Sequence, residues 1–200
     1  EKQIPRGRRK IKFLTFFPLK PWLAAAAAVI LLAGTFLLLR TEKEVSLTAT
    51  AVTGDVQIYQ TAAVRWSGMK VGQSIETGDL IQTRKDSAVT LVKARNYQLN
   101  LCENSELVRR RNNTYAIRRG TGSVLTLPRF HSSTLCIESP SAVAVVRVTA
   151  FFLDINEDRT ELKVARGTVE FSGEEKDRGI MLVKEGWKSR VSRGQPPNTP

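Results

Sequence analysis

Histidine and cysteine are scarce in this sequence, and their scarcity argues against several kinds of site. His131 is the only histidine, and Cys102 and Cys136 are the only cysteines. A general base needs a nucleophile and an orienting acid, and nothing in the sequence ties either to His131, so we expect no enzyme activity. Two cysteines without further thiols or histidines do not complete the ligand set of a zinc site. We therefore expect neither a metal centre nor a cofactor.

Other motifs of chemical sites are missing or incomplete. No glycine-rich phosphate loop precedes a helix, and no paired carboxylates stand out. The acids Asp154, Glu157 and Asp158 flank a turn, but their spacing lacks the full ligand set of a calcium loop. We interpret these acids as a solvated hairpin rather than as a calcium site.

The two cysteines leave two interpretations open. Outside the cytoplasm, Cys102 and Cys136 can oxidise to a disulfide. Closing this 34-residue separation would stabilise the fold by about 3–4 kcal/mol. Alternatively they are buried thiols that face the core among leucine and isoleucine neighbours.

Acidic residues are outnumbered, and the excess positive charge is unevenly placed. The chain has 31 Lys and Arg against 19 Asp and Glu, a formal net charge of +12. Residues 1–20 contain seven basic residues and one acid, which is half of that excess, and residues 21–39 carry no charge. A uniformly basic nucleic-acid-binding protein would not concentrate its charge in this way, so we expect no nucleic-acid partner.

The uncharged segment predicts one transmembrane helix at residues 21–40. Residues 22–39 (WLAAAAAVILLAGTFLLL) would span about 27 Å as a helix, close to the bilayer's hydrocarbon core of about 30 Å. A buried helix of a soluble domain is usually shorter and has a polar stripe, and a cleaved signal has a shorter apolar run. We therefore expect an uncleaved anchor. The residues expected to anchor it are Trp22, Leu23, Ile30, Leu31, Leu32, Phe36, Leu37, Leu38 and Leu39.

The charge asymmetry around this segment predicts its orientation. Basic residues precede the helix in excess, whereas the charges that follow it are balanced, so the positive-inside rule places residues 1–20 in the cytoplasm and residues 41–200 outside it. The basic tail at residues 2–20 is expected to contact anionic lipid headgroups, with about 1 kcal/mol per basic residue near the surface. The expected partners therefore include the lipid bilayer itself.

Beyond residue 41 the sequence predicts strands separated by turns. Short apolar and β-branched runs recur, many of them alternating with polar residues as half-buried strands do. They lie at residues 55–60, 80–83, 88–92, 97–101, 106–110, 123–127, 142–146, 150–155, 160–164, 168–171, 180–183 and 187–191. Turns are predicted at 53–55, 77–79, 112–113, 119–122, 156–158, 166–168 and 185–186. This spacing indicates a mainly β domain, a sandwich, barrel or solenoid, and a repeated Gly-x-Val triplet weakly favours the solenoid.

The most distinctive surface feature is a predicted arginine hairpin at residues 109–119. Alternation along its two arms directs the side chains to both faces of the sheet. Arginine clusters bind carboxylates and phosphates in bidentate fashion, so a lipid headgroup, an acidic polysaccharide or an acidic protein patch are the candidate partners. The alternative is a solvated hairpin that protects a sheet edge. The candidate contact residues are Arg109, Arg110, Arg111, Arg118 and Arg119, around the turn at Asn112 and Asn113.

Several short motifs follow one another in a characteristic order. They are GDV at 54–56, GDLIQT at 78–83, SPSA at 139–142, VRVTAF at 146–151 and TELKVARGTV at 160–169. In order and spacing, over residues 48–192, they resemble the FecR domain of bacterial envelope proteins. That family usually has TP-x-A, V-R-G-T-x-F and V-x-x-G-x-V in the last three places. This chain departs from the pattern at Ser139, where threonine is usual, and at Val148, where glycine is usual.

The resemblance implies a non-catalytic extracytoplasmic domain, β-solenoid-like or β-sandwich-like, on a single-pass protein of the bacterial inner membrane. The domain, at residues 48–192, would lie in the periplasm between a linker at 41–47 and a flexible tail at 193–200. Well-understood family members relay a signal from an outer-membrane TonB-dependent receptor to a cytoplasmic sigma factor. The visible tail of twenty residues is short for a sigma-binding domain, and no receptor-contacting module follows.

We therefore expect a structural or accessory subunit that packs against an integral membrane or envelope protein complex through its β domain. Two alternatives remain open. One is a transmembrane signalling regulator of the sigma-factor-regulator type, and the other is an envelope-polysaccharide binder.

Overall fold

The computed structural model describes residues 46–94, 96–127, 134–174 and 179–198, which lie within one compact unit at Val45–Pro200. The basic tail and the predicted membrane anchor, Trp22 to Leu39, lie outside the described residues. In the part that is described, no helix is long and apolar enough to cross a membrane.

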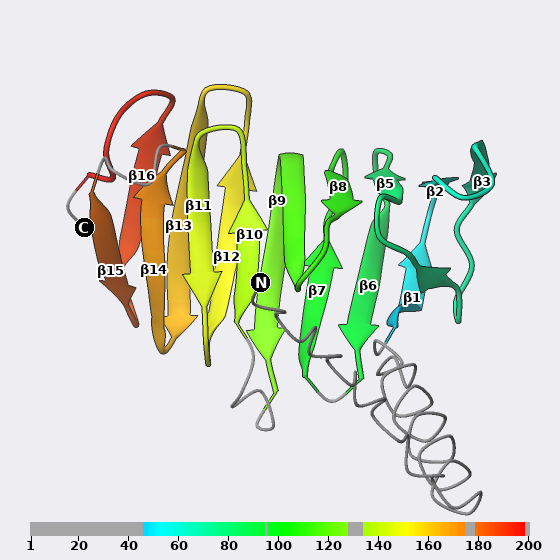
Figure 1. Cartoon of the computed structure of the whole chain (residues 1–200), viewed down its shortest axis with the longest axis horizontal. Coiled ribbons are helices and arrows are strands. Elements are labelled where there is room, and N and C mark those ends of the chain that lie inside the picture. Colours follow the sequence, from blue (N-terminus) through cyan, green and yellow to red (C-terminus); the bar gives the residue numbers. More distant parts are fainter. Residues whose placement is uncertain (1–45, 95, 128–133, 175–178, 199–200) are drawn as a thin grey trace, which may run out of the picture. The chain divides into compact units, whose positions relative to one another are not determined.

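The described domain is built from strands, as the sequence predicts (Figure 1). In chain order they are β1 (Leu47–Thr53), β2 (Val56–Gln60), β3 (Arg65–Gly68), β4 (Ser74–Ile75), β5 (Leu80–Thr83), β6 (Ala88–Lys93), β7 (Tyr97–Leu101), β8 (Glu106–Arg109), β9 (Thr114–Thr126), β10 (Leu135–Glu138), β11 (Ala142–Val146), β12 (Ala150–Ile155), β13 (Arg159–Arg166), β14 (Thr168–Gly173), β15 (Ile180–Lys184) and β16 (Lys188–Ser192). The all-β fold class is confirmed.

The strands form two sheets that share the long strand β9. Sheet A has the order β4-β1-β6-β7-β9-β12-β13-β16. Sheet B has the order β3-β2-β5-β8-β9-β10-β11-β14-β15. Among the strand pairs of the described residues, β9 with β10 is parallel and the remainder are antiparallel. Figure 1 shows the strands of the two sheets running side by side along the domain.

The two sheets bury their inward side chains in one common core. Leu91 of β6 and Phe151 of β12 come from sheet A, and Ile81 of β5 and Phe171 of β14 come from sheet B. Along each strand these residues alternate with more exposed neighbours, which is the period-two pattern that the sequence displayed. The described domain is therefore a β-sandwich whose halves are joined through β9.

The predicted turn at residues 119–122 is wrong, because β9 runs through it without a break. Up to Arg119 the strand pairs with β8 in sheet B, and from Gly120 onward it pairs with β12 in sheet A. Gly120 has a φ of 97°, a conformation that residues with a side chain rarely adopt, and the β8–β9 register shifts beside it. The glycine thus bends the strand from one sheet into the other instead of reversing it.

Two of the FecR-like motifs, GDLIQT at 78–83 and SPSA at 139–142, supply side chains that hold turns together. The buried carboxylate of Asp79 accepts hydrogen bonds from the backbone N–H groups of Thr61 and Glu76, each at 2.9 Å. The hydroxyl oxygen of Ser139 accepts a hydrogen bond from the N–H of Ala142 at 3.0 Å and lies 2.7 Å from the hydroxyl oxygen of Thr160. Serine supplies the same hydroxyl group as the threonine that is usual in the motif, so this departure preserves the contact.

The departure at Val148 does not require a special backbone angle. Val148 is exposed and is not among the residues with positive φ. The positive φ, 84°, belongs to Gly167, where an added Cβ would collide with the carbonyl oxygen of Val148. Valine is therefore tolerated at position 148, and the conformational demand for glycine lies at position 167.

Candidate anion-binding face around the arginine hairpin

The predicted arginine hairpin is formed by β8, the turn at Asn112 and Asn113, and the first half of β9. Both asparagines have positive φ, 56° and 57°, as the central residues of a type I′ turn require. The N–H of Arg110 donates to the carbonyl of Thr114 at 2.9 Å, and the N–H of Thr114 donates to the carbonyl of Arg111 at 3.1 Å. This tight turn fixes the register of the two arms and hence the positions of their arginines.

A buried polar network anchors the turn to the neighbouring strands. The side-chain oxygen of Asn113 accepts hydrogen bonds from the ammonium group of Lys93 at 2.6 Å and from the hydroxyl of Tyr97 at 3.2 Å. The hydroxyls of Tyr97 and Tyr115 lie 2.7 Å apart, and their rings meet edge to face. The carbonyl of Asn113 also accepts from the N–H of Cys136 on β10. The hairpin tip is therefore attached both to sheet A and to β10.

Arg109 is a structural residue and does not face a partner. It is only 3% exposed, and its guanidinium donates to the carbonyl of Ile75. Its backbone bonds with Gly78 and Asp79 connect β8 to the turn before β5. Arg109 therefore leaves the predicted set of contact residues, because alternation turns it toward the interior.

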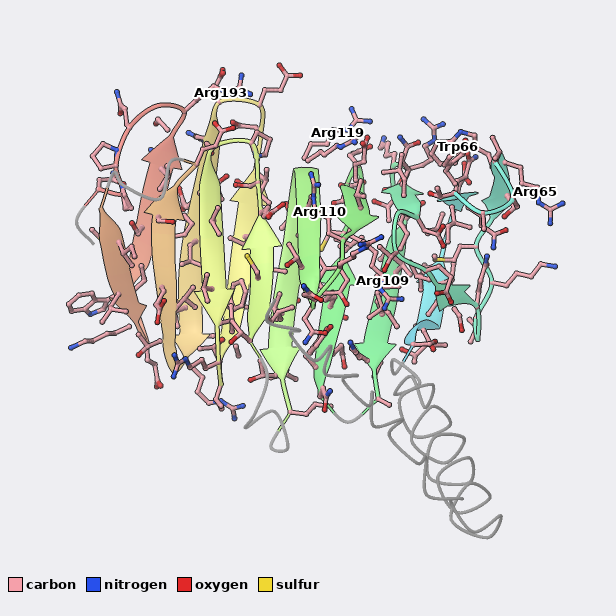
Figure 2. All side chains as sticks on the ribbon, viewed as in Figure 1. Arg65, Trp66, Arg109, Arg110, Arg119 and Arg193 are labelled. Atoms are coloured by element: carbon pink, nitrogen blue, oxygen red, sulfur yellow. The ribbon has the colours of Figure 1, made fainter. Side chains whose placement is uncertain are left out.

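Three of the exposed arginines of the hairpin already hold carboxylates. Arg110 binds Glu138 of β10, with Nε 3.0 Å from Oε2. Arg118 lies 2.8 Å and Arg119 3.8 Å from the carboxylate of Glu106, which is nearly buried. Figure 2 shows Arg110 and Arg119 projecting at different heights along the hairpin. These pairs show that the hairpin binds carboxylates in its own fold.

Arg111 differs from its neighbours. It is exposed at the hairpin tip, and it makes no ion pair with a described residue. Its charge is therefore the least compensated of the hairpin.

Two hollows adjoin on the outer face of sheet B and share Arg110 and Glu138. One has a volume of about 400 Å³ and extends toward Val143 of β11, and the other has about 470 Å³ and extends toward Val108 of β8. Ala116 lies between Val108 and Glu138 in the strand pairing. We call the two hollows together the Arg110 groove.

A comparable ion pair lies on sheet A, remote in the strand order from the groove. The guanidinium of Arg190 on β16 donates to Glu161 on β13 from Nη2 at 2.7 Å and from Nε at 3.2 Å. This hydrogen bonding, together with the positive charge of Arg190, lowers the pKa of the Glu161 carboxyl below its ordinary value. The Arg190–Glu161 ion pair is therefore a matched control for the Arg110–Glu138 ion pair of the groove.

The two cysteines are not joined in a disulfide in the structure. Cys102 is exposed just after β7 in sheet A, and Cys136 is half-buried on β10 in sheet B. Neither side chain belongs to the buried core, contrary to the alternative in which both face it. On β10 the core-facing residues are Leu135 and Ile137, so alternation turns Cys136 toward the outer face.

The remaining predicted candidates are His131 and the acids of the turn at residues 156–158. His131 lies outside the described residues. At the β12–β13 hairpin, the side-chain oxygen of Asn156 accepts from the N–H groups of Asp158 and Arg159, which closes the turn. Within the described ranges, no group of three or more His, Cys, Asp or Glu side chains is placed to hold a metal ion.

Comparison with known proteins identifies part of this domain. Residues 79–170 match the family model described as FecR protein. No curated protein matches the chain. Two crystal structures of a putative anti-sigma factor from Parabacteroides distasonis ATCC 8503, at 1.65 and 2.50 Å resolution, each align with a TM-score of 0.49 and 11% sequence identity. Each alignment covers 60% of this chain and 59% of the other, so this chain matches less than two thirds of their length.

The matched segment coincides with the centre of the sandwich. It begins at Asp79, whose carboxylate holds the turn before β5, and ends at Glu170 within β14. It includes the bend at Gly120 and both arms of the arginine hairpin. Residues 79–170 of this chain are therefore a FecR domain.

Proposed function

We propose that this chain is a non-enzymatic signalling regulator of the sigma-factor-regulator type, and that its β domain works by contacting another protein. The observation that carries the proposal is the FecR match at residues 79–170, which spans the bent strand and the arginine hairpin. FecR proteins of known role relay signals across the bacterial envelope.

In this proposal the chain crosses the inner membrane once. Residues 21–40 would form the anchor, residues 1–20 would lie on anionic headgroups in the cytoplasm, and the β domain would lie in the periplasm. The support is the uncharged segment and the charge asymmetry around it. A reporter enzyme that is active only outside the cytoplasm, fused after residue 200, should be active, and an inactive fusion would contradict this topology.

Transcription tests the regulatory role. Deleting the gene should change the transcript levels of a defined set of promoters, and the full chain should restore them. A chain with Gly120→Val should not, because the substitution distorts the strand that joins the two sheets. An unchanged transcriptome after deletion would contradict the proposal.

A second candidate is an accessory subunit of a larger membrane complex. The observation that favours it is the exposure of large apolar residues on the strands at both ends of sheet B, with Trp66 at one end and Ile180 and Leu182 at the other. Gentle detergent extraction followed by native sizing separates the two roles. A stable stoichiometric assembly without any sigma factor would favour the accessory subunit.

A further inference from the structure

The Arg110 groove owes its shape to a small residue in the middle of sheet B. The pairs Val108–Ala116, Ala116–Glu138 and Glu138–Val143 place these four residues in one row across β8, β9, β10 and β11. Ala116 has the shortest side chain of the row, and its sequence neighbours Tyr115 and Ile117 belong to the buried core. Strands are about 4.8 Å apart, so the row is about 14 Å long, which matches about four residues of an extended peptide.

The groove combines an apolar floor with charged side chains of both signs, among which arginines outnumber carboxylates. Ala116, Val143 and Pro140 contribute apolar surface, and Arg110 and Arg118 line the same hollow together with Glu138 and Glu174. Arg111 lines the adjoining hollow at the hairpin tip. Successive side chains of an extended peptide point to opposite sides of its backbone. A peptide with alternating apolar and acidic residues would therefore place its apolar side chains on the floor of the groove and its carboxylates within reach of the arginines at the sides.

Glu138 occupies the position that a partner carboxylate would take. Its carboxylate is 3.0 Å from Arg110, and both side chains are partly exposed, 39% and 59%. An ion pair this exposed contributes little, about 0–1 kcal/mol, so a second carboxylate meets little resistance when it competes for Arg110. Glu138 is in effect a competitor built into the site.

We propose that the Arg110 groove binds a short extended acidic segment of a partner protein, with Arg110, Arg111 and Arg118 holding its carboxylates. The proposal rests on the proposed function only in taking the partner to be a protein. An acidic polysaccharide fits less well, because the described residues that line the two hollows include no aromatic ring on which a sugar could stack. Trp66 lies toward the β2–β3 end of the sheet, away from Arg110 (Figure 2).

The test is a titration of the full chain with a labelled hexapeptide of alternating glutamate and leucine. A glutamine–leucine hexapeptide and an oligoglucuronate are the comparison probes. Arg110→Ala should weaken binding of the acidic peptide about tenfold, because it removes a cation and leaves Glu138 to repel the peptide. Glu138→Gln should tighten binding about threefold by removing the competitor.

Two further variants separate charge and shape from folding. Ala116→Leu keeps every arginine but fills the floor, and it should also weaken binding about tenfold, because a filled groove excludes the apolar side chain. Arg190→Ala removes an arginine of a similar ion pair on sheet A, and it should leave binding unchanged. Unfolding midpoints equal to that of the wild type establish that each variant is folded.

Several outcomes would overturn the proposal. They are equal binding of the glutamine peptide, an equal loss in Arg190→Ala, no tightening in Glu138→Gln, and tighter binding of the oligoglucuronate with the same dependence on the variants. Peptide binding is measured on the purified chain and sigma-factor control is measured in cells, so the two proposals fail on different readouts.

Discussion

Replacing Gly120 with alanine tests the bend that carries β9 from sheet B into sheet A. Two effects add at this position. The φ of 97° is outside the range that alanine adopts without strain, and left-handed backbone costs about 1–2 kcal/mol for residues with a Cβ. The new Cβ would also lie 2.5 Å from the Cα of Ser105 and closer still to its hydroxyl oxygen. Since a backbone atom is involved, strands must shift, and such overpacking costs about 1–3 kcal/mol.

We therefore expect Gly120→Ala to lower the free energy of unfolding by about 2–5 kcal/mol. Gly72→Ala is the matched control, because Gly72 has a φ of 84° but an added Cβ would meet no atom within 4 Å. The control should lose only about 1–2 kcal/mol. Urea unfolding of the full chain, followed by far-ultraviolet circular dichroism, measures the free energy of unfolding of both variants. The comparison holds when the two variants have equal m-values. Equal losses in the two variants would refute the packing argument at Ser105.

Three further predictions concern other described residues. Val64 has a φ of 51° and is 73% exposed, so its backbone is strained while its side chain packs little. Asparagine adopts positive φ more readily than valine, so Val64→Asn should raise the free energy of unfolding by about 0.5–1 kcal/mol. An unchanged or lower urea midpoint would contradict the presence of this strain. Asp79→Ala leaves two backbone N–H groups without their acceptor and should lower the free energy of unfolding by about 2–4 kcal/mol. Asp79→Asn should lower it less, because one acceptor oxygen remains. A decrease under about 1 kcal/mol in Asp79→Ala would show that the turn holds without the carboxylate. The lowered pKa of Glu161 means that its ionised form contributes stability above its ordinary value of 4.5, and that this contribution disappears as the pH falls through the lowered folded pKa. Glu161→Gln should therefore destabilise at pH 7 by less than about 1 kcal/mol and make no difference in stronger acid, and a deficit that persisted there would contradict this linkage.

The strands with regular alternation could be predicted from the sequence, because their signal is local. Residues 88–92 and 150–155 each show the period-two pattern, and each is a strand of sheet A. β3 and β4 escaped prediction because they are short and carry few apolar residues. β10 was not predicted as a strand, because its segment was considered only for Cys136. Its parallel pairing with β9 is a long-range contact that no local pattern encodes.

The arginine hairpin was predicted, but the roles of its members were not. Alternation alone places arginines on both faces, and it cannot tell that Arg109 is the one inside, because that depends on the carbonyl of Ile75 in a distant strand. Lys93 was missed because a lysine at a strand end is normally solvated. Its hydrogen bond to Asn113 exists only once the hairpin tip folds against β6. The groove likewise needs Ala116 and Val143 in one row, which strand pairing alone provides.

The most direct test of the proposed regulatory role is the composition of the complex that the full chain forms in its own cells. A tagged chain, extracted in mild detergent after brief cross-linking, should recover a sigma factor in a stoichiometric ratio. That recovery should disappear when the tag is carried by a chain lacking residues 1–20, which the proposal places in the cytoplasm. Recovery of a fixed membrane assembly with no sigma factor would contradict the account.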